Sequence, residues 1–215
     1  MLNGRCFKMN IEMINAEDLI SNPRDEMSKI FVEGWYEDFK RLCKDKNKLR
    51  RAFEHIFTLE NFYVAQVDKQ IMAFVAVCDR IDEKRAIHLD AKIIRKYLGF
   101  FRGSIATYML TKVLIKKKYP FQIPTGTGVI EFVATLPEAR GKGLAGKTIE
   151  YAMEDANYQA YILEVVDTNH GAIKLYERLG FEEFTREKSP FPPKHSGFEY
   201  LIYMKREINV EKNND

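Results

Sequence analysis

The chain has 215 residues, of which 46% are hydrophobic and 30% are charged, and its net charge is +3. This length is sufficient for one domain that buries a core without disulfides or metal ions. The small net charge, spread along the chain, argues against a dedicated nucleic-acid-binding protein.

The three cysteines and four histidines are far apart in the sequence, so we expect free thiols in a reducing compartment and no metal site. The N-terminal segment lacks the apolar run of a signal peptide, and no stretch approaches a membrane span. These features predict a cytoplasmic protein without a membrane partner. The densest basic run, residues 112–120, could contact an anionic partner, but we interpret it as a solvated helix end.

Hydrophobic periodicity divides the chain into strands and helices in a mixed order. The predicted strands are residues 7–14, 62–68, 70–79, 129–135, 161–167 and 199–207, with a short extended piece at 86–89. The predicted helices are residues 22–44, 47–57, 92–118 with a break at 99–103, 140–156 and 169–180. This order predicts a single α/β domain over residues 1–215, with a mixed sheet flanked by helices and a helical insert at about 84–126.

The string GKGLAGKT at 141–148 matches two nucleotide-site patterns. Read from Gly141 to Thr148, it fits the phosphate loop of nucleoside triphosphatases. Read as Arg140-x-x-Gly143-x-Ala145, it fits the pyrophosphate-binding turn of acyl-CoA-dependent N-acetyltransferases. Both loops bind phosphate oxygens through backbone N–H groups at a helix start, so the local chemistry does not separate them.

The neighbouring sequence favours the second pattern. Five residues, LPEAR, separate the preceding strand from Gly141, whereas a triphosphatase loop follows its strand almost at once. The segments IEFVATLPEARGKGLAGKT and YILEVVDTNHGAIKLYERLGF, within residues 130–184, resemble the GCN5-related N-acetyltransferase (GNAT) superfamily. The resemblance implies a GNAT fold, acetyl-CoA as co-substrate, and direct transfer of an acetyl group to an amine.

Cofactor-binding residues follow from the same resemblance and from the chemistry of the loop. The two loop glycines allow close approach of the backbone, and the free N–H groups of the helix start suit a pyrophosphate. The predicted contacts are Val133, Ala134, Thr135, Arg140, Gly141, Lys142, Gly143, Leu144, Ala145, Gly146, Asn169, Ala172 and Tyr176. Asn169 is equally well explained as the N-cap of the following helix.

Three residues are candidates for catalysis. The resemblance places Tyr176 beside the sulfur, where its hydroxyl, with an ordinary pKa of about 10, can protonate a departing thiolate. Glu164, in the L-E-V strand, is the first candidate for the base, and Glu131 on the adjacent strand is the second. A surface salt bridge is an equally good explanation for either glutamate.

The acceptor pocket is predicted from elements that the family places around the thioester. These are Trp35, Tyr36 and Phe39, the segments 92–104 and 189–200, and His195 within the second segment. The acceptor itself, the acyl-chain length and the oligomeric state, with a homodimer as one option, stay open. An alternative function is a non-catalytic acyl-CoA-binding regulatory module on the same fold.

Overall fold

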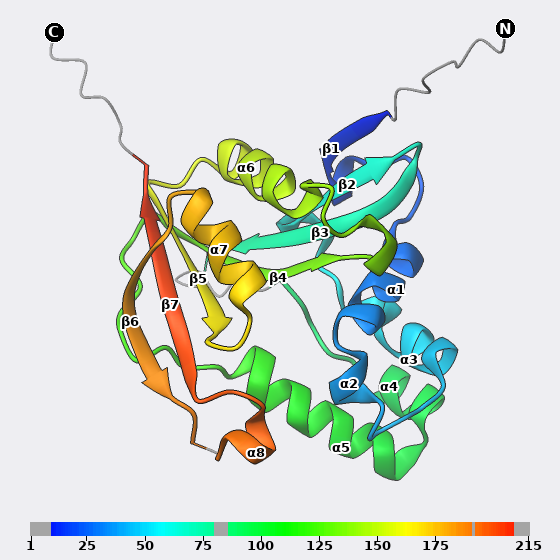
Figure 1. Cartoon of the computed structure of the whole chain (residues 1–215). Helices are drawn as coiled ribbons and strands as arrows, with labels where there is room; N and C mark the ends of the chain where they lie inside the picture. The colour runs from blue at the N-terminus through cyan, green and yellow to red at the C-terminus, as the bar shows by residue number, and fades with distance from the viewer. Residues whose placement is uncertain (1–9, 80–85, 191, 209–215) are drawn as a thin grey trace, which may run out of the picture.

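The computed structural model describes residues 10–79, 86–190 and 192–208. Its centre is a seven-stranded mixed sheet in the order β1-β2-β3-β4-β5-β7-β6 (Figure 1). All neighbouring strands are antiparallel except β4 and β5. The strands are β1 Ile11–Asn15, β2 Phe62–Val67, β3 Gln70–Cys78, β4 Thr127–Thr135, β5 Ala160–Val166, β6 Glu182–Lys188 and β7 Tyr200–Glu207.

Helices cover both faces of the sheet. They are α1 Arg24–Gly34, α2 Tyr36–Phe39, α3 Lys46–Phe53, α4 Ala91–Leu98, α5 Phe100–Leu110, α6 Leu144–Ala156, α7 His170–Arg178 and α8 Pro193–Ser196. Short 3₁₀ turns and a π-helical turn at Thr111–Ile115 complete the helical structure. No helix in the described part of the chain is both long and apolar enough to cross a bilayer.

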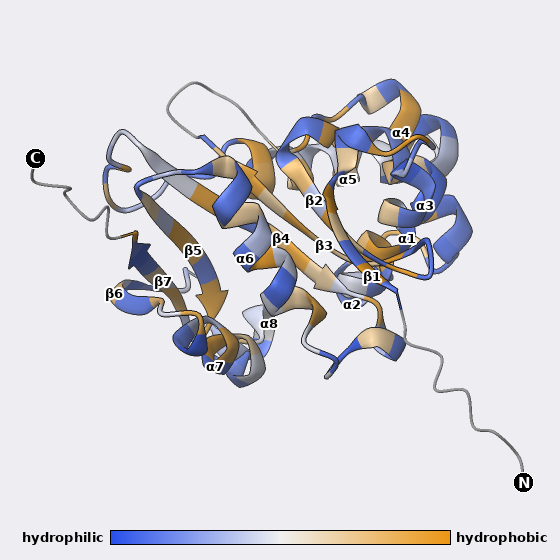
Figure 2. Ribbon diagram, turned by 90° about the horizontal axis from the view of Figure 1, so that it is seen from above, coloured by the Kyte–Doolittle hydropathy of each residue, from blue (hydrophilic) through white to orange (hydrophobic). Residues whose placement is uncertain are grey.

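Alternate residues of the strands build two separate hydrophobic cores, one on each face of the sheet. One core packs against the face covered by α1, α3, α4 and α5 and includes Phe31, Phe62 and Phe74. The other lies under α6 and α7 and includes Tyr63, Val75 and Tyr176. Figure 2 shows apolar residues along the strands between these two helical layers. The predicted mixed α/β architecture is confirmed.

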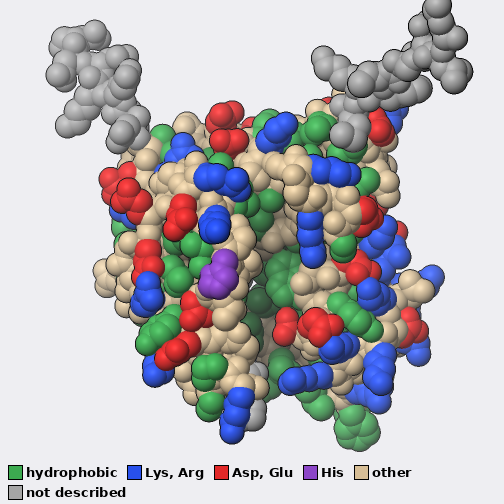
Figure 3. Space-filling model, in the orientation of Figure 1, with side chains coloured by type: hydrophobic (Ala, Val, Ile, Leu, Met, Phe, Trp, Pro, Cys, Tyr) green, Lys and Arg blue, Asp and Glu red, His purple; other side chains and the backbone are tan. Residues whose placement is uncertain are grey.

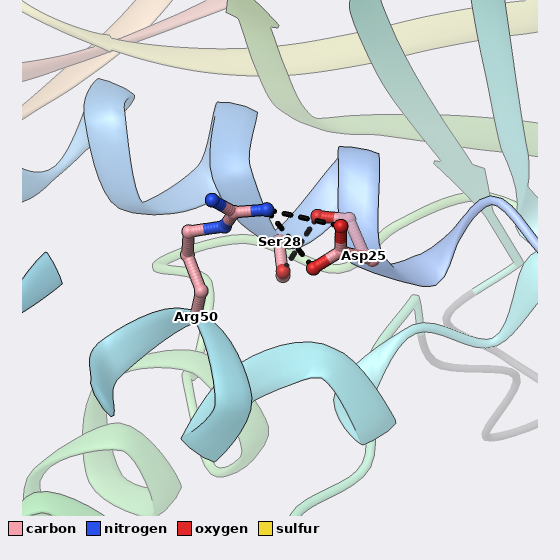
Figure 4. A network of polar contacts seen from close by, with 3 residues as sticks. All are labelled: Asp25, Ser28 and Arg50. Carbon is pink, nitrogen blue, oxygen red and sulfur yellow. Dashed lines mark hydrogen bonds and ion pairs between the residues drawn. The ribbon is translucent and has the colours of Figure 1, made fainter. Parts of the chain in front are cut away.

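An ion pair joins α1 to α3 on the first face. One guanidinium nitrogen of Arg50 lies 3.0 Å from each carboxylate oxygen of Asp25, and the Ser28 hydroxyl donates to the Asp25 carbonyl at 2.8 Å (Figure 4). The Asp25 side chain is mostly exposed, so this pair contributes at most about 1 kcal/mol to stability. Its main effect is to orient α3 against α1.

The helical segment between β3 and β4 starts at a capped helix and turns at a single glycine. The Asp90 carboxylate accepts hydrogen bonds from the N–H groups of Lys92 and Ile93, which begins α4. Gly99 has φ 82° and separates α4 from α5. The predicted break at 99–103 is therefore too long, because residues 100–103 already form the first turn of α5.

His55 anchors the start of α4. Its Nε2 accepts a hydrogen bond from the Asp90 N–H at 3.0 Å, and its ring lies 5.8 Å from that of His88. Burial, followed by the neighbouring His88, lowers the pKa of His55 below its usual value. The folded protein therefore binds this proton less readily than the unfolded chain does, and its stability decreases as the pH falls below about 6.5.

We expect the free energy of unfolding, measured by urea titration, to decrease between pH 7 and pH 5. In His55→Gln this slope should be smaller, because the titrating group is gone. His170→Gln, which removes an exposed imidazole on α7, should keep the full slope. Equal slopes in the wild type and His55→Gln would contradict this assignment.

Other predicted elements differ from the structure at their ends. The predicted helix over 22–44 is two helices, since Trp35 leaves helical geometry between α1 and α2. The predicted helix over 47–57 ends as an α-helix at Phe53, and a 3₁₀ turn follows. The turn at Asp68-Lys69 is confirmed, with positive φ at both residues. Residues 7–9 of the predicted strand at 7–14 lie outside the described residues.

Candidate active site

Strands β4 and β5 pair only over their first halves. Their register runs from Thr127 opposite Ala160 to Ile130 opposite Leu163. Beyond this point, the described pairing of β4 is with β3 and that of β5 is with β7. The two strands therefore diverge, as Figure 1 shows, and form a fork at their carboxyl ends. The carboxyl ends of adjacent parallel strands are a frequent place for ligand sites in α/β sheets.

A β-bulge lies in β4 just after the fork opens. The register shifts between Glu131 opposite Ala76 and Ala134 opposite Phe74. Within the bulge Phe132 has φ 51°, a conformation that is costly for a bulky side chain. Its ring lies 6.1 Å from that of Trp35 and 6.3 Å from that of Phe62. This aromatic packing holds the strained backbone in place.

The bulge determines which backbone groups of β4 face the fork. The Leu136 N–H donates to the Met72 carbonyl of β3 at 2.8 Å. Alternate residues of a strand direct their backbone groups to opposite neighbours, so Thr135 and Val133 direct theirs into the fork. The Thr135 carbonyl accepts a hydrogen bond from Arg140 Nε at 3.3 Å, and the Thr135 hydroxyl is buried without a partner. This geometry favours Val133 and Thr135 over Ala134 among the predicted strand contacts.

The loop after β4 has the conformation that its glycines predict. A 3₁₀ turn at Pro137–Ala139 separates the strand from the loop. Gly141 and Gly143 have φ 74° and 76°, and Gly143 is the N-cap of α6. A Cβ atom on either glycine would meet no atom within 4 Å. The glycines are therefore required by the backbone conformation, and the space in front of the loop is open.

Cationic side chains surround this helix start. The side chains of Arg140, Lys142 and Lys147 are all exposed beside the loop. The first N–H groups of a helix have no acceptor within the helix, and the helix dipole adds positive potential there. The loop can therefore bind a doubly charged anion through backbone and side-chain groups together.

The second half of the GKGLAGKT string has a structural role. A Cβ atom on Gly146 would lie 3.2 Å from a methyl carbon of Leu175, so this glycine allows α6 and α7 to pack closely. The Thr148 hydroxyl is buried and donates to the Leu144 carbonyl at 2.8 Å. A triphosphatase loop needs that hydroxyl for Mg²⁺, so the structure disfavours the phosphate-loop interpretation.

Helix α7 brings Tyr176 to the core beneath the fork. Asn169 caps the helix, since its side-chain oxygen accepts from the Ala172 N–H at 3.2 Å. Tyr176 is 6% exposed and belongs to the same hydrophobic cluster as Ile130 and Leu163, the last paired residues of β4 and β5. Burial raises the pKa of Tyr176 to about 12, so its hydroxyl stays protonated at neutral pH.

The two candidate bases lie on the opposite face of the sheet, at the first positions after the pairing ends. Glu164 Oε2 lies 2.5 Å from Lys117 Nζ, and both side chains are about one-fifth exposed. The Glu131 carboxylate accepts from the Tyr119 hydroxyl at 3.3 Å and from Cys78 Sγ at 3.9 Å. The contacts of Glu131 favour a structural role, which makes Glu164 the better candidate for the base.

A model of the acetyltransferase (GNAT) family matches residues 24–181, which include the fork, the glycine loop and α7. The chain belongs to the GNAT acetyltransferase family. N-alpha-acetyltransferase 30 of Schizosaccharomyces pombe is 32% identical over 79 residues, covering 35% of this chain and 53% of that relative. The matched region thus spans about half the length of the curated relative.

Solved structures share the fold of this GNAT chain. The ribosomal-protein-S18-alanine N-acetyltransferase of Escherichia coli has a TM-score of 0.54 at 15% identity, covering 96% of this chain and 99% of that one. An N-acetyltransferase of Staphylococcus aureus Mu50 has a TM-score of 0.57 at 16% identity, with coverage of 92% and 100%. A Salmonella typhimurium protein, solved with its cofactor acetyl-CoA, has a TM-score of 0.52 at 12% identity, with coverage of 96% and 98%.

Several residues predicted for the acceptor pocket of this GNAT domain lie elsewhere. Phe39 is buried in an aromatic cluster, 4.9 Å from the ring of Phe53. Phe100 and Phe101 are 67% and 81% exposed on α5. Tyr36 directs its hydroxyl to the Lys44 carbonyl at 2.9 Å. Trp35 contacts the bulge beside the fork, since its ring packs against that of Phe132.

The segment 189–200 is attached to the end of β5. The Asp167 carboxylate accepts hydrogen bonds from the N–H groups of Glu199 and Tyr200 at 3.2 and 3.1 Å. His195 belongs to α8, but its side chain is outside the described set. Figure 3 shows a hollow lined by hydrophobic side chains between the half of the molecule with α7 and the half with α1 and α2.

Sequence reasoning missed a group of residues that closes one side of the fork. Residues 116–121, between the π-helical turn and β4, bring Lys117 to Glu164 and Tyr119 to Glu131. The rings of Tyr119 and Phe121 also lie 6.0 and 5.1 Å from that of Tyr203. The interpretation of this basic run as a solvated helix end is therefore wrong for Lys117, although Lys116 and Lys118 are exposed.

Proposed function

We propose that this chain is an acetyl-CoA-dependent N-acetyltransferase that moves an acetyl group to a primary amine by direct transfer. The observation that carries the proposal is the fork between β4 and β5, with the glycine loop above it, Tyr176 on one face and Glu164 on the other. Family membership independently supports acyl transfer.

The residues present fit acetyl-CoA. The open, cationic loop at Gly141–Gly143 suits the pyrophosphate. The fork-facing backbone groups of Val133 and Thr135 suit the amide groups of the pantetheine arm. The buried Thr135 hydroxyl has no partner in the described structure, and a ligand in the fork can supply one.

The groups around the fork have different roles in acetyl transfer. Acetyl-CoA supplies the acetyl group as a thioester. Fork-facing N–H groups of β4 stabilise negative charge on the carbonyl oxygen. Glu164 accepts a proton from the attacking amine.

Tyr176 donates a hydrogen bond to the departing sulfur. Complete proton transfer from a hydroxyl of pKa about 12 to a free thiolate, whose pKa is about 8.5, is unfavourable by roughly 5 kcal/mol. We therefore expect the hydrogen bond to strengthen as charge develops on the sulfur, while the proton stays on Tyr176 and CoA leaves as a thiolate that takes its proton from solvent.

The pKa of the acceptor amine determines how much free energy its deprotonation before attack requires. Removing a proton from a lysine-type amine of pKa about 10.4 at pH 7 costs roughly 4–5 kcal/mol, against about 1.4 kcal/mol for an α-amine of pKa about 8. A single carboxylate base therefore suits an α-amine better. The name of the Schizosaccharomyces pombe relative also makes a peptide α-amine the first acceptor to test.

The proposal is tested by incubating the full chain with acetyl-CoA and a panel of peptides and small amines. We expect release of CoA that depends on the amine, with an acetylated product identified by mass spectrometry. Binding of acetyl-CoA without CoA release for any amine would instead support the non-catalytic module. Thermal stabilisation by ATP–Mg²⁺ but not by acetyl-CoA would refute both.

A further inference from the structure

The contact between Lys117 and Glu164 has the composition of a binding site for an alkylammonium ion. Lys117 Nζ lies 2.5 Å from Glu164 Oε2 and 5.0 Å from the centre of the Tyr119 ring. A carboxylate and an aromatic face are the two groups that recognise such cations in proteins. Tyr203 pairs with Glu164 across β5 and β7, and its hydroxyl donates to the Glu187 carboxylate at 3.4 Å. Burial, then the Glu164 carboxylate, raise the pKa of the Tyr203 hydroxyl.

Lys117 reaches this site from a segment without regular secondary structure. Its backbone lies in the irregular segment between the π-helical turn and β4, so neither a helix nor a strand holds it. Glu164 Oε2 is buried and makes no hydrogen bond of acceptable geometry, although the ammonium is within contact distance. The charges are therefore close but misaligned, which leaves the carboxylate able to accept a better-oriented cation.

The position of the site connects it with the fork. Glu164 is the first residue of β5 after the last pair with β4, Ile130 opposite Leu163. An amine bound to this carboxylate lies at the opening between the two strands.

We propose that Glu164, the Tyr119 ring and the Tyr203 hydroxyl form an ammonium site that Lys117 fills in the free protein and that the acceptor amine takes over. This inference rests on the proposed function, because it assigns the acceptor's amine to a place beside Glu164. Lys117 is then an internal competitor of the acceptor. Its removal lowers the concentration of acceptor needed for half-maximal rate.

The site is tested first by binding alone. Lys117→Ala removes three methylene groups and an ammonium, which n-propylammonium chloride restores. We expect this salt to raise the Tm of Lys117→Ala by about 2–4 °C relative to NaCl at the same ionic strength. Neutral n-propanol should produce no such rise, and Lys117→Ala combined with Glu164→Gln should lose the response to the ammonium salt. An equal shift in the double variant, or in Lys118→Ala, which removes an exposed lysine, would overturn the proposal.

Kinetics provide the second test. For an amine that the wild type acetylates, Lys117→Ala should lower KM by about two- to sixfold. The reason is that Lys117 must leave Glu164 before the acceptor binds, and a partly exposed ion pair changes the apparent affinity by a factor of this size. Lys118→Ala should leave KM unchanged. An unchanged or higher KM in Lys117→Ala, or an effect confined to kcat, would overturn the competitor role. If n-propylammonium binds to Lys117→Ala but neither the wild type nor Lys117→Ala acetylates any amine, the transferase proposal is wrong and the ammonium site is still supported.

Discussion

Replacing Tyr176 with phenylalanine is expected to lower kcat by about 10²- to 10³-fold while the affinity for acetyl-CoA stays the same. The substitution removes only a hydroxyl, which is buried beneath the fork in a cluster of apolar side chains. Phenylalanine fills nearly the same volume, so the packing of α7 and the loop beside it should persist. The loss should therefore appear in the rate of transfer, with acetyl-CoA binding measured by calorimetry as the reference.

Tyr63→Phe is a matched control. Tyr63 lies in the same hydrophobic cluster, but its hydroxyl donates to the Asp155 carboxylate at 3.0 Å. This substitution should lower the free energy of unfolding by about 1 kcal/mol or more and leave kcat normal. Tyr176→Phe should show the reverse, with normal stability and a reduced kcat. Normal turnover in Tyr176→Phe would eliminate the proposed role of this hydroxyl.

The pH profile gives a second measure of the same residue. With a pKa of about 12, Tyr176 stays protonated throughout the range in which the protein can be assayed. We therefore expect kcat to show no alkaline decrease from this group below about pH 11. A decrease near pH 9 that disappears in Tyr176→Phe would show that the hydroxyl ionises far more easily in the complex.

Replacing Gly143 with alanine is expected to weaken acetyl-CoA binding by about tenfold or more. Gly143 has φ 76° at the N-cap of α6, and an alanine in this region costs roughly 1–2 kcal/mol. A loop that relaxes to avoid this strain turns its N–H groups away from the bound anion. A loss of about 1.4 kcal/mol corresponds to a tenfold increase in Kd. Calorimetric titration with acetyl-CoA measures the effect.

Gly197→Ala provides the control for strain alone. Gly197 has φ 81° at the end of α8, and a Cβ atom there would also meet no atom within 4 Å. Both variants should therefore lose similar stability in thermal unfolding. Only Gly143→Ala should lose acetyl-CoA affinity. Equal Kd values for Gly143→Ala and the wild type would show that the pyrophosphate binds elsewhere.

Local chemistry made part of this architecture predictable. Gly141 and Gly143 predict a left-handed turn at a helix start, and both residues have positive φ in the structure. Asn169 is a good N-cap by residue type, and its side chain caps α7. These features depend on residues within a few positions of one another, so a single sequence contains the information.

Features that depend on distant contacts were not predictable. The bulge at Phe132 requires the packing of Trp35 and Phe62, which are far away in the sequence. The ion pair between Lys117 and Glu164 joins the segment before β4 to β5, and nothing near either residue indicates its partner. No bounds were predicted for strand β6, because its charged sequence lacks the alternation of a half-buried strand. Charged residues suit this position, since β6 is an edge strand that must avoid pairing with other chains.

The central claim, that the fork and the glycine loop together form one acetyl-CoA site, is tested most directly by a crystal structure of the full chain with acetyl-CoA. We predict that the pyrophosphate contacts the backbone N–H groups of residues 141–146. We also predict that the thioester lies in the fork, with the Tyr176 hydroxyl within hydrogen-bonding distance of the sulfur. A pyrophosphate bound away from the loop, or a thioester outside the fork with Tyr176 out of reach, would contradict the account.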